Sequence, residues 1–405
     1  MSLTACSEDN YLMLEGGIPD PVFEIVVWDK PFAGSAEKPY YERMFQEFEQ
    51  AYPHIRVIHM EAAFQKEREQ FMTAVAGGEQ PDLYNAAFPD MESYIDQGIP
   101  ADITGMWTQY PDTLAYNKRI FEENGINQGE AFLNWDSFAA AAEQVTDHSR
   151  NQYGYTILGT EWADWFYEYY VWQAGGDLTS KNPDGTVQLT FNSNAAVQAL
   201  SYYQDLKFRH GVTQPNTLQS LDDNKKDFYA GRAATMFVAS NWFGEMLESG
   251  VDMDDIGVTT FPEGPAGLSL AQVGGGIWIL NPNASEEKQR AAFTYATFMT
   301  SKYALDEMLR FQKEHGMLPN LLSVREDVDP IAYADGMPEK LVRSIQRAAE
   351  ESRLEYFLKS RLSPYVSAAV QEVLLNEYTK PYDALTRAQE KAQREVIDAY
   401  NMEFN

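Results

Sequence analysis

The sequence predicts an α/β protein with two domains, and two observations support this prediction. From residue 21 onward, short β-branched segments alternate with amphipathic helical segments, as in proteins whose parallel sheets are covered by helices. The chain has 405 residues, whereas a single hydrophobic core stops growing at roughly 250–300 residues. The length therefore favours two cores over one.

The first part of the chain contains the clearest alternation. "PVFEIVVW", residues 21–28, is a predicted strand because it is short, apolar and bounded by Pro and Asp. An amphipathic helix is expected over 39–52, and Pro53 ends it before a second strand over 55–60. A helix over 66–78 stops at two glycines, and "PDLYNAA" supplies the third strand. These segments form a βαβ unit, which implies a parallel sheet.

The rest of the chain continues the pattern. Predicted helices cover 134–146, 193–211, 223–233, 284–301 and 385–400, and either Asn134 or Asp136 is expected to cap the first. Predicted strands cover 234–240, the start of 255–267, and 274–280. The last strand begins with three glycines, and a phosphate-binding loop would need a helix directly after them. We therefore expect glycine there to permit a close approach of the backbone, at a crossover or at a ligand.

The segment "EWADWFYEYYVW", residues 161–172, is rich in aromatic residues. At 100° per residue, most of its rings share an arc of roughly 160°, while Glu161, Asp164 and Glu168 lie on the opposite side. This pattern predicts a helix with one buried aromatic face and one acidic face.

The composition restricts the partners. There are 61 Asp and Glu residues against 31 Lys and Arg, a formal net charge of -30, so polyanions such as nucleic acids and anionic lipid surfaces would be repelled. The five histidines, at 54, 59, 148, 210 and 315, have neither metal-ligand nor catalytic-triad spacing. We expect no nucleic-acid partner, no metal and no cofactor.

The single cysteine, Cys6, lies in "SLTACSED". This resembles the lipobox of bacterial lipoproteins, in which the cysteine carries the lipid. The basic and apolar regions of a signal peptide do not precede it, so either the start is trimmed or the match arises by chance. Cys6 is therefore a candidate lipid anchor, with a free terminal thiol as the alternative.

Several motifs occur in one order along the chain: "FEQAYPHIRVIHM", "FMTAVAGGEQPDLYNAAF", "YIDQGIPADIT", "AYNKRIFEENGI", "YAGRAATMFVASNW" and "GGGIWILNPNASEEKQRAAFTYATFMTS". In this order they resemble bacterial ABC-transporter extracellular solute-binding proteins of the carbohydrate group, related to maltose- and oligosaccharide-binding proteins. The resemblance covers nearly the whole chain after residue 20. It implies a two-lobe periplasmic-binding-protein-like fold, in which each lobe is a sheet flanked by helices and crossing hinge segments join the lobes.

The resemblance also implies where the chain divides. Lobe 1 would comprise residues 21–118 and 272–322, and lobe 2 would comprise 119–271 and 323–405, with 1–20 as a flexible tether. The family has some twenty more residues where this chain has only the segment around 107–116, so the first crossover is expected to be shortened or rebuilt. The implied partners are a carbohydrate ligand and the membrane permease of an ABC importer. The protein would be a monomer, extracellular or periplasmic, tethered to the membrane through Cys6.

Ligands of open α/β sheets lie beyond the carboxyl ends of the strands, and sugars need aromatic platforms with hydrogen-bonding groups beside them. The residues that follow the predicted strands or lie near the glycine run are Trp28, Asp29, Lys30, Asn85, Phe88, Asp90, Asn241, Trp242, Gly276 and Trp278. The resemblance adds Trp162 and Trp165 as platforms, Asp164 as a partner for a sugar hydroxyl, and Tyr365.

These candidates have structural alternatives. Trp28 would plug the end of its strand, Trp278 would belong to the core, and Asn85 and Asp90 would cap the helix that follows them.

Three other functions would use some of the same residue types as sugar binding. Two carboxylates among aromatic rings would suit a glycoside hydrolase, but no hydrolase motif accompanies them. A polyamine would use acidic groups and aromatic walls. Ferric iron would need adjacent tyrosines, yet the pairs at 40–41, 169–170 and 202–203 fall in predicted helices, where neighbours diverge by about 100°. The collinear motifs favour a binding protein for a carbohydrate, and the number of platforms favours an oligosaccharide.

Overall fold

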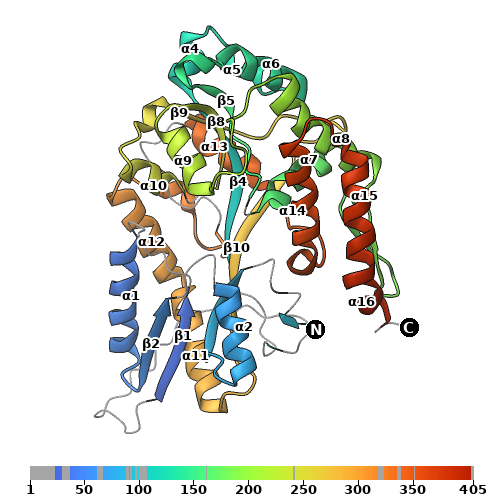
Figure 1. Cartoon of the computed structure of the whole chain (residues 1–405). Coiled ribbons are helices and arrows are strands. Elements are labelled where there is room, and N and C mark those ends of the chain that lie inside the picture. Colours follow the sequence, from blue (N-terminus) through green and yellow to red (C-terminus); the bar gives the residue numbers. More distant parts are fainter. Residues whose placement is uncertain are drawn as a thin grey trace.

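The protein consists of two lobes joined by two long strands, as the computed structural model shows (Figure 1). The structure describes residues 23–29, 37–61, 67–87, 91, 94–95, 99, 107–160, 162–239, 242–317, 323–334, 339–350 and 352–402. The fold is the predicted mixed α/β type, with two lobes whose sheets are flanked by helices. Among the described residues, no helix has the length and apolar character that crossing a bilayer requires.

Lobe 1 is built on a sheet with strand order β2-β1-β3-β10. Strand β1 is parallel to β2 and β3, whereas β10 is antiparallel to β3, so the predicted βαβ unit is confirmed. One face packs against α1, α11 and α12, and the other packs against α2. The elements are β1 (Phe23–Asp29), α1 (Lys38–Ala51), β2 (Ile55–Glu61), α2 (Glu67–Gly77), β3 (Leu83–Ala87), β10 (Ala271–Leu280), α11 (Glu286–Met299) and α12 (Lys302–Glu314).

Lobe 2 surrounds a second group of strands, β8, β5 and β9, which joins β4. Its elements are β4 (Trp107–Asn117), α4 (Lys118–Glu123), α5 (Gln128–Ala131), α6 (Trp135–Val145), β5 (Tyr153–Tyr155), α7 (Ala163–Gln173), β6 (Thr179–Lys181), β7 (Val187–Leu189), α8 (Asn194–Gln204), α9 (Leu221–Tyr229), β8 (Ala233–Ala239), α10 (Phe243–Glu248), β9 (Ile256–Thr259), α13 (Glu339–Glu350), β11 (Ser352–Arg353), α14 (Lys359–Leu375), α15 (Pro381–Ala392) and α16 (Asp398–Met402). Short π-helical segments extend α8 over Asp205–Arg209 and connect α15 to α16 over Gln393–Ile397.

Strands β4 and β10 cross between the lobes. The first half of β4 pairs with β10, and its second half pairs with β8 and β9. The sequence did not indicate this strand, because Pro111 stands in its middle and proline is rare within sheets. The segment expected to be a rebuilt crossover is therefore a continuous strand, while the residue boundaries of the lobes remain a prediction.

Local signals in the sequence explain most of the other elements. The Asn134 side chain caps α6 in a reciprocal pair with Ser137, as one of the two predictions for that helix required. Gly78 follows α2 with a φ of 74°, a left-handed conformation that glycine adopts without a Cβ penalty. The tyrosine pairs at 40–41, 169–170 and 202–203 all lie in helices, as expected.

The aromatic face predicted for the helix over 161–172 is buried as expected, but the described acidic residues on its opposite side are buried as well. Every residue of α7, from Ala163 to Gln173, is buried, including Asp164 and Glu168. Helices α14 and α8 pack against it, and it also contacts β10. Partners from other elements accompany both buried carboxylates: Tyr356 and Ser367 donate to Asp164, and Gln272 donates to Oε2 of Glu168.

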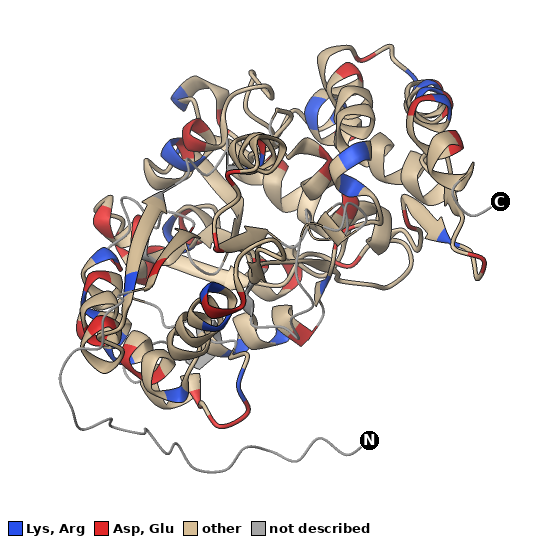
Figure 2. Ribbon diagram, turned by 90° about the horizontal axis from the view of Figure 1, so that it is seen from below, with Lys and Arg blue, Asp and Glu red and all other residues tan. Residues whose placement is uncertain are grey.

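Charged residues are distributed over both lobes. Figure 2 shows acidic and basic positions interspersed along the helices, and in this view the described basic residues do not gather into one face.

Candidate ligand-binding site

The carboxyl ends of the lobe 1 strands face lobe 2. Strand β10 runs from lobe 2 into lobe 1 and is antiparallel to β3, so the parallel strands β1, β2 and β3 point toward lobe 2 (Figure 1). Asp29 is the last residue of β1, and Asn85 lies in β3. The sheet rule therefore places these polar residues at the edge where a ligand between the lobes would lie.

Asp29, Asn85 and Gly276 come together at this edge. Asn85 Nδ2 donates a hydrogen bond to Asp29 Oδ1 at 3.0 Å, from a position inside β3. A Cβ at Gly276 would lie 2.2 Å from Asn85 Oδ1. Glycine is thus needed where β10 passes Asn85, which confirms the expected close approach at a crossing strand.

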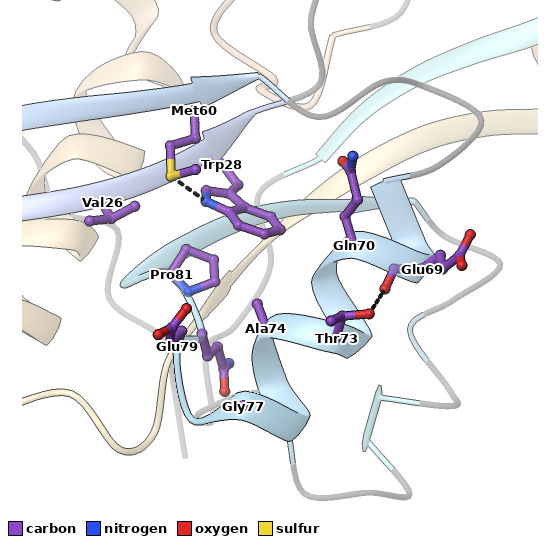
Figure 3. A pocket seen from close by; sticks show the side chains of 11 residues that line it. Val26, Trp28, Met60, Glu69, Gln70, Thr73, Ala74, Gly77, Glu79 and Pro81 are labelled. Carbon is purple, nitrogen blue, oxygen red and sulfur yellow. Dashed lines mark hydrogen bonds between the residues drawn. The ribbon is translucent and has the colours of Figure 1, made fainter.

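Trp28 lies on the α2 side of the same sheet and is half-buried. Its Nε1 donates to Met60 Sδ at 3.0 Å, and its ring meets Phe71 and Tyr84 edge to face at 6.3 and 6.5 Å. Together with Val26, Met60, Ala74 and Pro81 it lines a hollow of about 810 Å³ between α2 and the sheet (Figure 3). Trp28 therefore occupies part of the space between α2 and the lobe 1 sheet.

Helix α7 of lobe 2 begins at the most exposed of the candidate tryptophans. Trp162 is 37% exposed and adopts a left-handed φ of 64° immediately before the helix. This conformation is unusual for a bulky residue, and such strain concentrates at functional sites. The Trp165 ring lies 5.8 Å from that of Trp162 but is 4% exposed. Trp162 is therefore the exposed ring of this pair, and the buried Trp165 ring packs against it.

Asp164 is fully buried, and its carboxylate is held by side chains of lobe 2. Tyr356 Oη donates to it at 2.7 Å, Ser367 Oγ donates at 3.2 Å, and Lys359 Nζ lies at 3.3 Å. Lys359 Nζ also lies 5.1 Å from the centre of the Trp165 ring, in a cation–π arrangement. These contacts correct the role expected for Asp164, because its oxygens position Lys359 and are not presented to a sugar hydroxyl.

Asp112 of β4 is a buried carboxylate that the sequence reasoning missed. Trp165 Nε1 donates to its Oδ2 at 2.8 Å, and the Tyr169 hydroxyl donates to the same oxygen. Burial raises the pKa of Asp112 to about 6, although both hydrogen bonds favour the charged form. No sequence signal marked Asp112, because the strand that carries it was itself not predicted.

Helix α7 also holds the other crossing strand. Gln272 Nε2, on β10, donates to Glu168 Oε2 and to the Trp165 carbonyl oxygen. Burial raises the pKa of Glu168 well above its usual range, while Lys359 opposes that shift. The helix that begins at Trp162 therefore contacts both strands that connect the lobes.

The lobes also meet directly beside this helix. Arg68 Nη1, in the first turn of α2, donates to the Ser360 carbonyl oxygen in the first turn of α14 at 3.2 Å. A second contact between the lobes joins Gly316, which follows α12, to Leu247 of α10. A Cβ at Gly316 would lie 3.8 Å from Leu247 Cδ2. The two lobes are therefore in contact through α2 and α14 and through the segments around α12 and α10.

Three other candidates lie elsewhere or play a different part. Trp278 is 7% exposed and packs against Tyr295 at 6.0 Å in the core of lobe 1, which removes it from the site. Tyr365 donates to Glu395 at 2.8 Å and so faces the C-terminal helices. Trp242 is half-buried at the start of α10, with Lys225 Nζ 4.2 Å from its ring centre. Lys30, Phe88, Asp90, Asn241 and the candidate anchor Cys6 lie outside the described residues.

Two lobes joined by crossing strands, with the carboxyl ends of the lobe 1 strands facing lobe 2, are the architecture of a protein that binds a small molecule between its lobes. The chain belongs to the bacterial extracellular solute-binding proteins, whose family model matches residues 33–304. The members of this family are binding proteins, not enzymes, and act outside the cytoplasm.

Individual relatives agree with this assignment. A binding protein of Brucella abortus (strain 2308) is 24% identical over 310 residues, which cover 69% of this chain and 72% of the relative. An ABC substrate-binding protein from Listeria monocytogenes, solved in complex with cycloalternan, has a TM-score of 0.76 at 20% identity and covers 92% of this chain and 98% of its own. A solute-binding protein from Thermotoga lettingae, bound with alpha-D-tagatose, has a TM-score of 0.77 at 22% identity, covering 92% and 99%.

Proposed function

We propose that the protein captures a sugar, with an oligosaccharide as the favoured ligand, between its two lobes and delivers it to the permease of an ABC importer. The observation that carries the proposal is the exposed Trp162 indole, which lies in lobe 2 against the buried Trp165 ring, together with the hydrogen-bonded pair of Asp29 and Asn85 at the strand ends of lobe 1. An indole face stacks on the C–H face of a sugar, and the polar groups bond its hydroxyls. The sugar ligands of the two solved neighbours support the same class.

We further propose that the lobes close on the sugar and that the protein is tethered outside the cell membrane. The sugar binds one lobe first, and closure about β4 and β10 then removes water from it. The protein acts as a monomer, with lobes divided near residues 118, 272 and 322, and Cys6 anchors it to the outer face of the membrane.

A thermal-shift screen against sugars, polyamines and metal ions tests the ligand class, since a ligand of the folded state raises the unfolding midpoint. We expect a sugar to raise it most. A polyamine as the strongest ligand would contradict the proposal. Release of shorter sugars on long incubation would instead favour the hydrolase.

Gly276→Ala is expected to weaken sugar binding about tenfold, roughly the effect of one hydrogen bond to a charged group. The added Cβ would lie 2.2 Å from Asn85 Oδ1 and push the amide away from Asp29. Titration calorimetry measures the affinity. Gly77→Ala is the matched control, since nothing lies within 4 Å of a Cβ there. Equal affinities in the two variants would remove Asn85 from the site.

Trp242→Ala separates a platform from a structural role. If the half-buried ring binds sugar, the variant loses about tenfold in affinity, and its unfolding midpoint without ligand stays nearly unchanged. Both quantities come from calorimetry on one preparation. A fall in the ligand-free midpoint with unaltered affinity would assign Trp242 to the packing against Phe237, whose ring lies at 5.7 Å.

A further inference from the structure

The contact between Arg68 and Ser360 joins the two lobes across 292 positions of the sequence. Arg68 comes from α2, which follows the cleft-facing end of β2, and Ser360 is the second residue of α14. The guanidinium donates to a main-chain carbonyl, a charge-assisted hydrogen bond. This contact can persist only while the two lobes are close together.

The acceptor of this bond lacks its normal helical donor. In an α-helix the carbonyl of residue i accepts from the N–H of residue i+4. For Ser360 that residue is Pro364, which lies inside α14 and has no N–H. The proline therefore leaves the Ser360 carbonyl available to a donor from outside the helix, and Arg68 of the other lobe supplies one.

The turn that carries this carbonyl is fixed in place. Leu358, immediately before α14, is 2% exposed and has a left-handed φ of 58°. Lys359 is held by Asp164 and lies over the Trp165 ring. Of the three non-glycine residues with positive φ in the described part of the chain, Trp162 and Leu358 begin α7 and α14, and the third is Asn151. Strained backbone of this kind persists where surrounding structure imposes it.

From these observations we infer that Arg68 is a positioning residue for the sugar site: it docks on the carbonyl that Pro364 leaves open and holds lobe 1 against the turn that supports Trp165. The inference rests on the proposed function, because it assigns the contact a role in retaining the sugar. Arg68 need not touch the ligand. A bond made only in the closed state stabilises that state, and sugar bound between the lobes then leaves more slowly.

Two substitutions test the inference from opposite sides of the contact. Arg68→Met removes the donor but retains a long apolar side chain. Pro364→Ala restores an N–H to α14, and this N–H then competes with Arg68 for the Ser360 carbonyl. Pro364 is exposed, so its replacement leaves the core unaltered. Arg56→Met is the matched control, because Arg56 is an exposed lobe 1 arginine whose ion-pair partner, Glu24, lies in the same sheet.

The measurement is the distance between spin labels at Glu42 in lobe 1 and Tyr378 in lobe 2, in a Cys6→Ser background and without sugar. Sugar release is measured separately by stopped flow, with the best ligand from the thermal screen. We expect Arg68→Met and Pro364→Ala to shift the distances toward the open form and to release sugar about tenfold faster, the equivalent of one charged hydrogen bond. The control should match the wild type.

Distances in Arg68→Met that equal those of the wild type would overturn the inference, as would a Pro364→Ala variant that closes normally. If the distances shift as expected but no sugar binds even the wild type, the inter-lobe contact is supported and the proposed function fails. The two ideas can therefore be separated.

Discussion

Trp162→Ala is expected to weaken sugar binding about 30-fold, because removing a stacked indole costs about 2 kcal/mol in area and stacking. Trp162 is 37% exposed, whereas its neighbour Trp165 is 4% exposed, so Trp162 is the ring that we propose stacks on the sugar. Titration calorimetry with the sugar found in the screen measures the effect. An affinity equal to that of the wild type would show that the exposed ring is not the platform.

Trp162→Gly is the control that separates the ring from the strain of its backbone. Glycine tolerates the φ of 64° at this position, whereas alanine retains a penalty of about 1 kcal/mol. Both variants should lose sugar affinity equally, while the glycine variant should unfold with about 1 kcal/mol more free energy than the alanine variant. Equal stabilities by chemical denaturation would mean that the left-handed conformation relaxes when the indole is removed.

Asp112→Asn is expected to make the stability of the protein less dependent on pH. Burial raises the pKa of Asp112 in the folded state to about 6, from an ordinary value of 3.8. The folded protein therefore holds a proton that the unfolded chain releases between these values, and stability falls as the pH rises through this window. A shift of about two units corresponds to about 3 kcal/mol. Asparagine still offers an oxygen to Trp165 and Tyr169 but does not ionise.

The comparison requires denaturant unfolding of both proteins from pH 4 to pH 7.5. The free energy of unfolding of the variant, relative to the wild type, should increase by about 2.4 kcal/mol across that range, with most of the change complete near pH 6.5. Glu168 titrates in both proteins, so its contribution cancels. Parallel profiles would contradict the raised pKa of Asp112.

Many elements of both lobes were predictable because each has a local signal. β-Branched strands, Gly78 after α2 and Asn134 before α6 act through their own backbone and near neighbours. Strand β4 was not predictable, because Pro111 weakens its local signal and its pairing with β10 involves residues about 160 positions away. Pairing over that separation depends on tertiary structure, which no local pattern records.

The candidate site also contains some residues that the sequence could identify and others that it could not. The sheet rule identified Asp29 and Asn85 without tertiary information, and the structure brings them into hydrogen-bonding contact. The role of Asp164 could not be inferred, since its partners Tyr356, Ser367 and Lys359 follow it by about 190 to 200 positions. Trp278 was a candidate that lies in the core instead. An aromatic residue near a glycine run has the same sequence signature in a core as at a surface.

Titration calorimetry of a panel of oligosaccharides into the wild type and into Trp162→Ala tests whether a sugar is captured between the lobes at Trp162. We expect saturable binding of one sugar per chain to the wild type and binding about 30-fold weaker to the variant. Saturable binding that is equally tight in both proteins, or heat from polyamines and from none of the sugars, would contradict sugar capture between the lobes at Trp162.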